Sequence, residues 1–162
     1  MGKYPVDAVA MLARIAAAVE PHRPATTVKE MFRGIDLRGK LRPSHLIILG
    51  VEAGLEYASP PAVFVPTRSG ATARRIAGFH LPPWIVALCS EEATCQQLQF
   101  SSGVYPVHEP EEPENWNPYV TKWLSDHGLS GDLAIMTEGP SSKHPEANHR
   151  MAIIDLRPKP KS

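Results

Sequence analysis

The sequence predicts an α/β fold with a mostly parallel five-stranded sheet and helices on both of its faces. From Ala62 onward, short β-branched runs alternate with helical patterns, and each helical pattern is about as long as a parallel crossover requires. The last two expected strands are separated only by the loop 138–149. This loop is too short to hold a crossover helix comfortably, so we expect the final pair of strands to be antiparallel.

The length of 162 residues predicts a single domain with three parts. These are a helical N-terminal part (3–60), an alternating core (62–156) and a flexible tail (157–162). The 17 Lys and Arg residues balance 17 Asp and Glu residues, so no overall charge favours nucleic acid or an anionic membrane. No apolar run reaches the roughly 18 residues of a membrane span, and no secretion signal follows Met1. We therefore expect a cytoplasmic protein with no nucleic-acid or membrane partner.

The N-terminal part predicts two long helices. The first covers residues 3–21, with Pro5 near its start. Its aliphatic residues recur at helical spacing, and the positions on the opposite face are mostly alanine. A helix that is apolar nearly all round is expected to be buried on more than one side. Ser44 is expected to cap the second helix, residues 45–58. The inner face of this helix is expected to consist of Leu46, Leu49, Val51 and Leu55.

Between these helices, a capping box at residues 27–30 indicates a short helix. The core then alternates strands and helices. Five strands are expected, at residues 62–65, 84–88, 103–107, 132–137 and 151–156. Three helices are expected between them, at residues 72–77, 91–98 and 119–127. Ser90 is expected to cap the second of these helices, and Gly128 to end the third.

The turn after the first expected strand is the main candidate site. Its hydroxyl groups come from Thr67, Ser69 and Thr72, and Gly70 permits close approach of the backbone to a ligand. The first amides of the following helix lack intrahelical partners, and three arginines stand nearby, Arg68, Arg74 and Arg75. Together these features predict a phosphate-binding turn. In the alternative interpretation, Thr67 or Ser69 only caps the helix and the arginines are solvated.

Other polar residues are expected at the same edge of the sheet. The carboxyl ends of parallel strands share one edge, where ligands bind in open α/β sheets. Cys89 and Ser90 follow the second expected strand, and the loop 138–149 follows the fourth. Their agreement with the Thr67–Thr72 turn favours the phosphate interpretation.

Several segments, taken in order, resemble one known family. They are GKYPVDAV at residues 2–9, TRSGATARR at 67–75, GVYPV at 103–107, GDLAIMTEG at 131–139, and the following loop that ends in Asn148. This ordered set resembles the C-terminal domain of pyruvate kinase and covers nearly the whole chain. The resemblance implies a three-layer α/β/α sandwich with four parallel strands and an antiparallel last strand.

The resemblance also implies a function. In that family this domain performs no phosphoryl transfer; it binds a sugar phosphate or nucleotide effector and makes subunit contacts. A small phosphorylated metabolite and further copies of the chain are therefore the implied partners. Magnesium, potassium and phosphoenolpyruvate belong to a catalytic barrel that precedes the GKYP segment in the family. We accordingly expect no catalytic residue, metal site or cofactor in this chain.

The resemblance assigns effector-phosphate binding to Thr67, Arg68, Ser69, Gly70 and Thr72. It places Ser141, Ser142 and Lys143 in the loop that closes over the other end of the effector. The usual loop is richer in glycine and has a threonine before its asparagine, whereas this chain reads GPSSKHPEAN. Glycine tolerates backbone conformations that proline and glutamate do not. A stand-alone structural or oligomerisation module with a vestigial pocket is therefore the alternative function.

A third hypothesis is an independent enzyme with Cys89 as nucleophile. Cys89 stands at the carboxyl end of an expected strand, where a following helix N-terminus lowers a thiol pKa, although Glu91 and Glu92 oppose this by repulsion. The spacing of Cys89 and Cys95 fits neither a CxxC motif nor a zinc site, so buried free thiols are the alternative.

Two further clusters have simpler interpretations than catalysis. His144 and His149 with Glu146 between them lie in a loop and lack the helical spacing of an HExxH zinc site. Trp116 and Trp123, on either side of Tyr119, indicate core packing or an aromatic surface for the sugar or base of a ligand.

Overall fold

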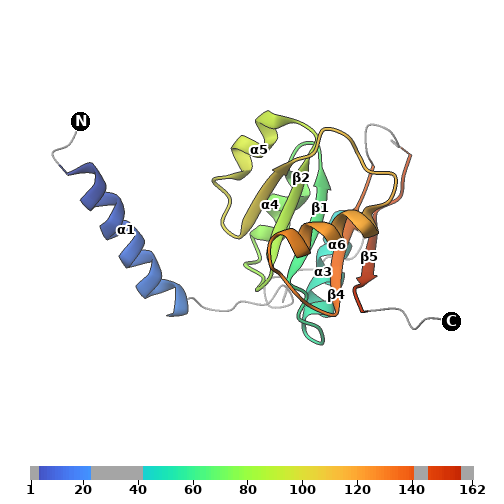
Figure 1. Cartoon of the computed structure of the whole chain (residues 1–162), viewed down its shortest axis with the longest axis horizontal. Coiled ribbons are helices and arrows are strands. Elements are labelled where there is room, and N and C mark those ends of the chain that lie inside the picture. Colours follow the sequence, from blue (N-terminus) through green and yellow to red (C-terminus); the bar gives the residue numbers. More distant parts are fainter. Residues whose placement is uncertain (1–3, 23–41, 141–145, 158–162) are drawn as a thin grey trace.

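The computed structural model describes residues 4–22, 42–140 and 146–157. The helices are α1 (Pro5–Val19), the short 3-10 helix η1 (Glu20–His22), α3 (Pro43–Leu55), α4 (Ala71–Ala77), α5 (Glu92–Leu98) and α6 (Trp116–Asp126). The strands are β1 (Ala62–Thr67), β2 (Trp84–Cys89), β3 (Val104–His108), β4 (Leu133–Glu138) and β5 (Arg150–Asp155) (Figure 1). The helix expected at residues 27–30 and most of the expected tail lie outside the described residues.

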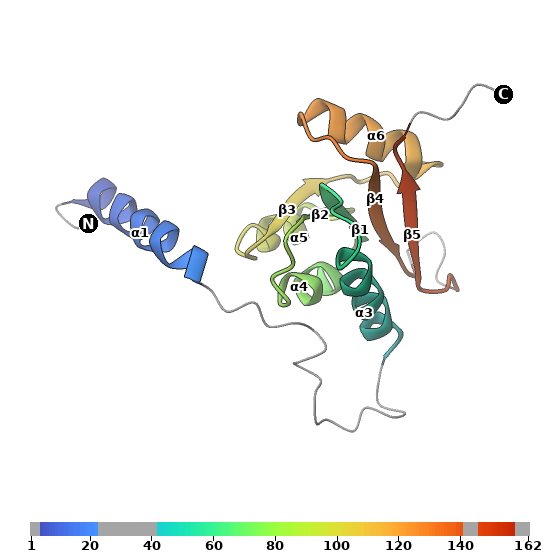
Figure 2. The same ribbon diagram turned by 90° about the horizontal axis from the view of Figure 1, so that it is seen from below.

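The strands form one five-stranded sheet in the order β3-β2-β1-β4-β5. Strands β1 to β4 pair in parallel, and β5 pairs antiparallel to β4, with Ala134 opposite Ile154. Helices α3, α4 and α5 cover one face of this sheet and α6 covers the other, which gives three layers (Figure 2). The predicted fold class is confirmed, including the antiparallel final pair.

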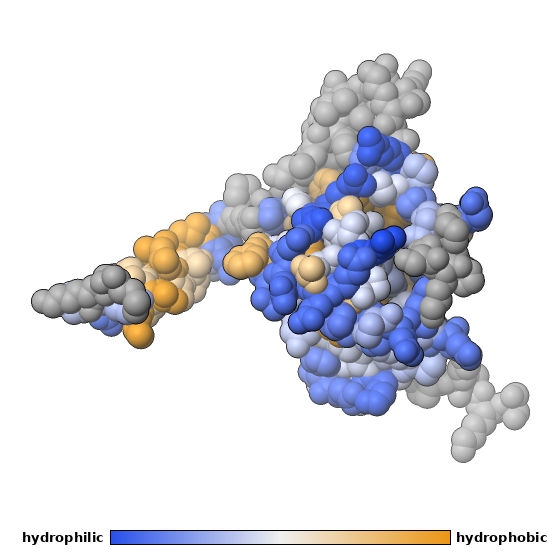
Figure 3. Space-filling view, turned by 90° about the horizontal axis from the view of Figure 1, so that it is seen from above, coloured by the Kyte–Doolittle hydropathy of each residue, from blue (hydrophilic) through white to orange (hydrophobic). Residues whose placement is uncertain are grey.

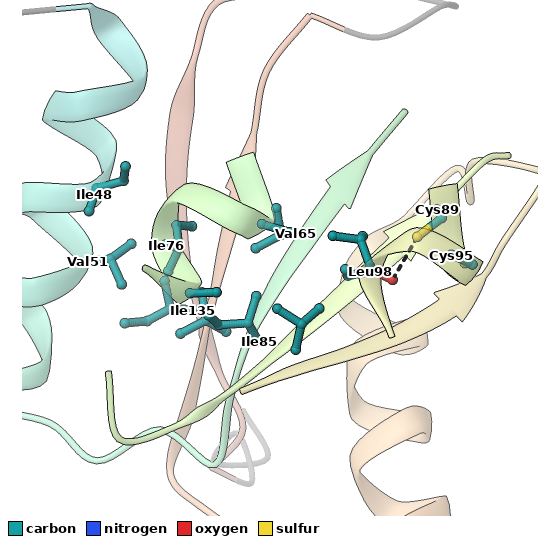
Figure 4. Close-up of a cluster of buried hydrophobic side chains, with 14 residues drawn as sticks. Ile48, Val51, Val65, Ile76, Ile85, Cys89, Cys95, Leu98 and Ile135 are labelled. Carbon is teal, nitrogen blue, oxygen red and sulfur yellow. Dashed lines mark hydrogen bonds between the residues drawn. The ribbon is translucent and has the colours of Figure 1, made fainter. Parts of the chain in front are cut away.

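The core lies on both faces of the sheet because side chains alternate along each strand. On the face of α3 to α5, Ile48, Ile76 and Leu98 pack against strand residues such as Val65 and Ile135 (Figure 4). On the other face, Phe64 packs against α6, and its ring meets the Trp123 ring edge-on at a centroid distance of 5.4 Å. The central strands are therefore buried on both sides.

Helix α1 does not pack as expected. None of its residues is buried, and large apolar side chains such as Val6 (78%) and Leu12 (66%) are mostly exposed. Figures 1 and 2 show α1 standing apart from the sheet, and Figure 3 shows its hydrophobic surface beside a mainly hydrophilic body. The expectation of burial is wrong for this helix because its apolar stripe meets no covering face among the described residues.

The second long helix begins earlier than predicted. Pro43 occupies its first turn, so the N-cap is Arg42, and Ser44 is a buried helical residue whose Oγ accepts a hydrogen bond from Arg75 Nη1 at 3.0 Å. Leu46 points outward with 57% exposure, whereas Ile48 and Val51 are buried. The predicted inner face is thus right for Val51 and for the half-buried Leu49 and Leu55, which pack against the same core, and wrong for Leu46.

The other caps also differ in part from the prediction. The N-cap of α5 is Glu91, not Ser90, and no side chain caps that helix. Helix α6 begins before the predicted start because Asn115 Oδ1 accepts a hydrogen bond from the Asn117 amide at 3.0 Å. Gly128 follows its end with a φ of +64°, as the glycine stop predicted.

Candidate anion-binding site

A cavity of about 260 Å³ opens at the carboxyl ends of β1, β2 and β4, as the parallel topology predicted. The turn after β1 contributes Pro66, Thr67, Arg68, Ser69 and Thr72, and the segment after β2 contributes Ser90. The loop from β3 to α6 contributes Glu109, Pro110, Glu112 and Trp116. The remaining lining residues are Ser44, Ile47, Thr137, Glu138, Gly139, Pro140 and His149. Of the predicted site residues, Ser141, Ser142 and Lys143 lie outside the described residues.

The turn after β1 is braced internally. The Gly70 amide donates a hydrogen bond to Thr67 Oγ1 at 2.9 Å, while the Thr67 hydroxyl keeps its own proton for a ligand. Gly70 has a φ of +71°, a left-handed conformation that glycine adopts without strain. A Cβ there would lie 2.9 Å from Arg74 Nη1 and 3.1 Å from Leu98 Cδ2. Glycine is therefore needed for the shape of the turn, whereas the expected close approach of Gly70 to a ligand stays a prediction because Gly70 does not line the cavity.

Only one of the three predicted arginines lines the cavity. Arg68 does so, and its Nε also pairs with Glu91 Oε1 at 2.9 Å. Arg74 instead donates from Nη2 to the Ser69 carbonyl at 2.6 Å, and Arg75 donates to Ser44. Arg74 and Arg75 therefore hold the turn and α3 in place, which is a structural role that the sequence did not indicate.

Helix α5 fixes the position of this turn. Thr94 is 7% exposed, and its Oγ1 donates a hydrogen bond to the Arg68 carbonyl at 2.8 Å. The Ser90 amide donates to the Thr67 carbonyl at 3.4 Å. These hydrogen bonds connect the turn after β1 to the segment after β2, and both segments line the cavity. Sequence reasoning missed Thr94 because its partner stands far away in the chain.

Thr137, at the end of β4, has an unusual environment. Its side chain is 3% exposed, it lines the cavity, and its Oγ1 has no hydrogen-bond partner within the described part of the chain. A buried hydroxyl without a partner costs about 1–3 kcal/mol. A ligand oxygen or a water molecule in the cavity would satisfy it. Local sequence did not indicate this role for Thr137, although its place at the end of an inner strand was available as a signal.

The side of the cavity nearest α6 is acidic and aromatic. Burial, followed by the interaction of its hydroxyl with the Glu109 carboxylate, raises the pKa of Tyr119 above its usual range. The Trp116 ring meets the Tyr119 ring edge-on, with centroids 5.6 Å apart. The carboxylate of Glu109 and the indole of Trp116 are thus both part of the cavity wall.

The side nearest β5 contains a paired carboxylate and a histidine. Glu138 forms an ion pair with Arg150 across the β4–β5 pair. His149 lies over Gly139, where a Cβ would approach its Nδ1 to 3.0 Å. Gly139 therefore allows the imidazole ring to reach the cavity wall.

Cys89 does not contribute to this site. It is fully buried, it does not line the cavity, and its Sγ donates to the Ala87 carbonyl at 3.5 Å (Figure 4). Burial, assisted by the neighbouring Cys95, raises the pKa of the Cys89 thiol to about 12. This environment disfavours the thiolate that the nucleophile hypothesis needs.

Two kinds of site, a metal site and a membrane-spanning helix, are absent from the described residues. Within residues 4–22, 42–140 and 146–157, no group of three or more His, Cys, Asp and Glu side chains is arranged to hold a metal ion. None of the helices in the described ranges is long and apolar enough to cross a membrane.

Comparisons with known proteins identify the family of this chain. Residues 55–154 match the family described as pyruvate kinase, alpha/beta domain. The chain is 36% identical to the pyruvate kinase of Thermococcus litoralis over 160 residues, which are 96% of this chain and 33% of that protein. It is 29% identical to the pyruvate kinase of Thermotoga maritima over 148 residues, 88% of this chain and 30% of that protein. The chain thus spans about a third of the length of these relatives.

A solved structure supports the fold assignment. A crystal structure of a pyruvate kinase from Cryptosporidium parvum aligns with a TM-score of 0.60 at 16% sequence identity. The alignment covers 90% of this chain and 26% of that one. At this identity the likeness shows a shared fold.

Proposed function

We propose that this chain, which belongs to the family of pyruvate kinase α/β domains, is a regulatory domain and not a catalytic domain. Its proposed ligand is a phosphorylated small metabolite. The proposed site is the cavity at the carboxyl ends of β1, β2 and β4. The bound phosphate contacts the lining residues Thr67, Arg68, Ser69 and Thr72, and Gly70 gives the turn the shape that presents them. Ser141, Ser142 and Lys143 are proposed to contact the rest of the ligand.

One observation carries this proposal. The unpartnered hydroxyl of Thr137 lines the same cavity as the hydroxyl-rich turn after β1. Hydroxyl groups and backbone amides donate hydrogen bonds to phosphate oxygens, and Arg68 supplies a positive charge at the rim. Bonds to a charged group are worth about 1.5–3 kcal/mol each, so a few of them support micromolar binding.

The first experiment is a thermal-shift screen of the chain with inorganic phosphate, ribose 5-phosphate, glucose 6-phosphate, AMP and fructose 1,6-bisphosphate. A ligand at 100 times its dissociation constant adds about 2.7 kcal/mol, which raises Tm by several degrees for a domain of this size. The absence of a shift with every compound would contradict the proposal.

Two variants locate the site. Replacing Ser69 and Thr72 together by alanine removes two donors at the rim, so the ligand-induced shift should disappear. A matched control replaces Ser125 and Ser130 by alanine. Both residues are exposed and do not line the cavity, so this variant should retain the ligand-induced rise in Tm. Thr137→Val removes only the unpartnered hydroxyl and should weaken binding without lowering the Tm of the free protein. Equal shifts in all variants would place the ligand elsewhere.

A second candidate function is subunit contact, which the exposure of α1 and the position of β5 favour. Helix α1 exposes a stripe of aliphatic side chains, and β5 is an edge strand whose Ile153 is 64% exposed. Exposed apolar patches and strand edges are typical of association surfaces. Light scattering at increasing concentration tests this function, because a molar mass that stays at 17.8 kDa would contradict it.

A further inference from the structure

We propose that helix α5 regulates the anion affinity of the turn after β1 through two opposing contacts with Arg68. Thr94 holds the turn in its binding shape, whereas Glu91 competes with the bound anion for the guanidinium of Arg68. This inference rests on the proposed phosphate site and adds two residues outside the cavity that set its affinity.

Helix α5 holds Arg68 at two points. It lies on the same face of the sheet as α4, the helix that follows the turn (Figure 2). Thr94 Oγ1 donates a hydrogen bond to the Arg68 carbonyl at 2.8 Å, and Glu91 Oε1 accepts one from Arg68 Nε at 2.9 Å. Glu91 is the N-cap of α5, and Thr94 lies in its first turn. The backbone and the side chain of one lining residue are therefore both bound by the start of one helix.

The contact with Thr94 positions the turn. Thr94 is buried and does not line the cavity, so its hydroxyl acts on a ligand only through the turn. Its hydrogen bond fixes the peptide group between Arg68 and Ser69, whose side chains both line the cavity. A peptide group that is already held in one orientation loses little conformational freedom when the turn binds an anion. Thr94 is thus a positioning residue that raises the affinity.

The contact with Glu91 has the opposite effect. Arg68 lines the cavity and Glu91 does not, so the ion pair joins the guanidinium to a carboxylate outside the cavity wall. A phosphate that binds Arg68 has to share this cation with the carboxylate and is repelled by it. The two side chains are 70% and 52% exposed, so their pairing is weak and an anion can displace it. Glu91 therefore lowers the affinity without closing the site.

The next residue offers a matched comparison. Glu92 is also exposed and begins the same helix, but its Oε1 accepts a hydrogen bond from Gln96 Nε2 at 3.5 Å. It does not line the cavity either. Both carboxylates stabilise α5 through the helix dipole. Loss of either charge should therefore affect the helix alike, whereas only loss of the Glu91 charge releases Arg68.

The test is calorimetric titration of the chain with the phosphate compounds of the thermal-shift screen, beginning with inorganic phosphate. Glu91→Gln should raise the affinity for each compound that binds by about two- to fivefold, which is the worth of an exposed ion pair. It should also lower the Tm of the free protein slightly, because a favourable charge leaves the start of the helix. Glu92→Gln should lower Tm by a similar amount and change the affinity by less than about twofold. A purely structural role of Glu91 would not raise the affinity while Tm falls.

A second pair of variants tests the positioning residue. Thr94→Val keeps the size of the side chain and removes its hydroxyl, so the affinity should fall by about three- to tenfold. Thr94→Ser restores the hydroxyl and should return the affinity to within about twofold of the unmodified chain. The control Thr121→Val removes a hydroxyl that also bonds a backbone carbonyl, that of Asn117 at 2.9 Å, but that lies outside the cavity wall. This control should leave the affinity unchanged. The Glu91 variant keeps the proposal testable if Thr94→Val does not fold.

The outcomes separate this inference from the proposed function. If the unmodified chain binds a phosphate compound and Glu91→Gln binds it equally or more weakly, the inference is wrong while the phosphate site stands. The same holds if Thr94→Val folds and binds as tightly as the unmodified chain. If neither the unmodified chain nor Glu91→Gln binds any compound of the screen, both the inference and the proposed function are overturned.

Discussion

Helices α1 and α3 both begin at a proline and both carry aliphatic side chains at helical spacing, yet they have opposite environments. Helix α1 has no buried residue over its 15 residues, whereas α3 buries Ile48 and Val51 within 13 residues. An apolar stripe therefore predicts a helix face that can be buried, but it does not predict whether the burying surface belongs to the same chain. Helix α3 therefore stabilises the domain, whereas α1 fits the association proposed above.

The largest expected contrast is between isoleucines of the two helices. Ile48→Ala should lower the free energy of unfolding by about 2–5 kcal/mol, because it leaves a cavity in a packed core. Ile15→Ala removes the same atoms from a side chain that is 52% exposed and should change it by less than about 0.5 kcal/mol. Urea unfolding at low protein concentration measures both. Equal losses would show that α1 is covered in the folded monomer.

A second contrast with the exposed helix α1 concerns the buried thiol of Cys89 in the core of the sheet. Because the pKa of Cys89 is raised to about 12, the unfolded chain loses this proton above about pH 9 while the folded chain keeps it. The thiol's contribution to stability is therefore complete below pH 9, and falls by up to about 1.4 kcal/mol per pH unit as the pH rises towards 12.

Denaturation measured between pH 8 and 10 tests this decline. Tyr119, whose pKa is also raised, adds its own loss only above about pH 10. The variant Cys89→Ala should therefore flatten the curve between about pH 9 and 10. An unchanged slope in that interval would show that another group titrates there.

A smaller contrast concerns composition, because α3 contains Gly50 and Gly54 whereas α1 contains no glycine. A Cβ at Gly50 would lie 3.6 Å from Met151 Sδ, an ordinary van der Waals distance. Gly50→Ala should therefore raise the free energy of unfolding by about 0.5–1 kcal/mol through higher helix propensity. A decrease in thermal unfolding experiments would mean that α3 lies closer to β5 than the structure indicates.

The smallest effect on stability is expected for Leu12→Glu in α1. Leu12 is 66% exposed, so the free energy of unfolding of the monomer should change by less than about 0.5 kcal/mol. The charge should instead weaken self-association through α1, which light scattering at high concentration measures. The exposed Thr121→Glu on α6 is a control that should leave association unchanged. Equal association of the unmodified chain and Leu12→Glu would remove α1 from the subunit contact.

Local chemistry determined much of this fold from the sequence alone. β-branched runs predicted all five strands, the short loop 138–149 predicted the antiparallel end, and Gly70 and Gly128 were expected at their turns. These features depend on alternation, helical period and backbone sterics, which act within a few residues. The hydroxyl-rich turn after β1 was found for the same reason.

Tertiary packing decided what those local rules leave open. It buried Ile48 instead of Leu46 and left α1 exposed. It also placed Arg74 and Arg75 in hydrogen bonds to Ser69 and Ser44, away from the cavity. It also brought Thr137 of β4 and Glu109, which directly follows β3, to the cavity beside the turn after β1. Helical period fixes which residues share a face, but long-range contacts choose the partner of that face, and a binding site is built from such contacts.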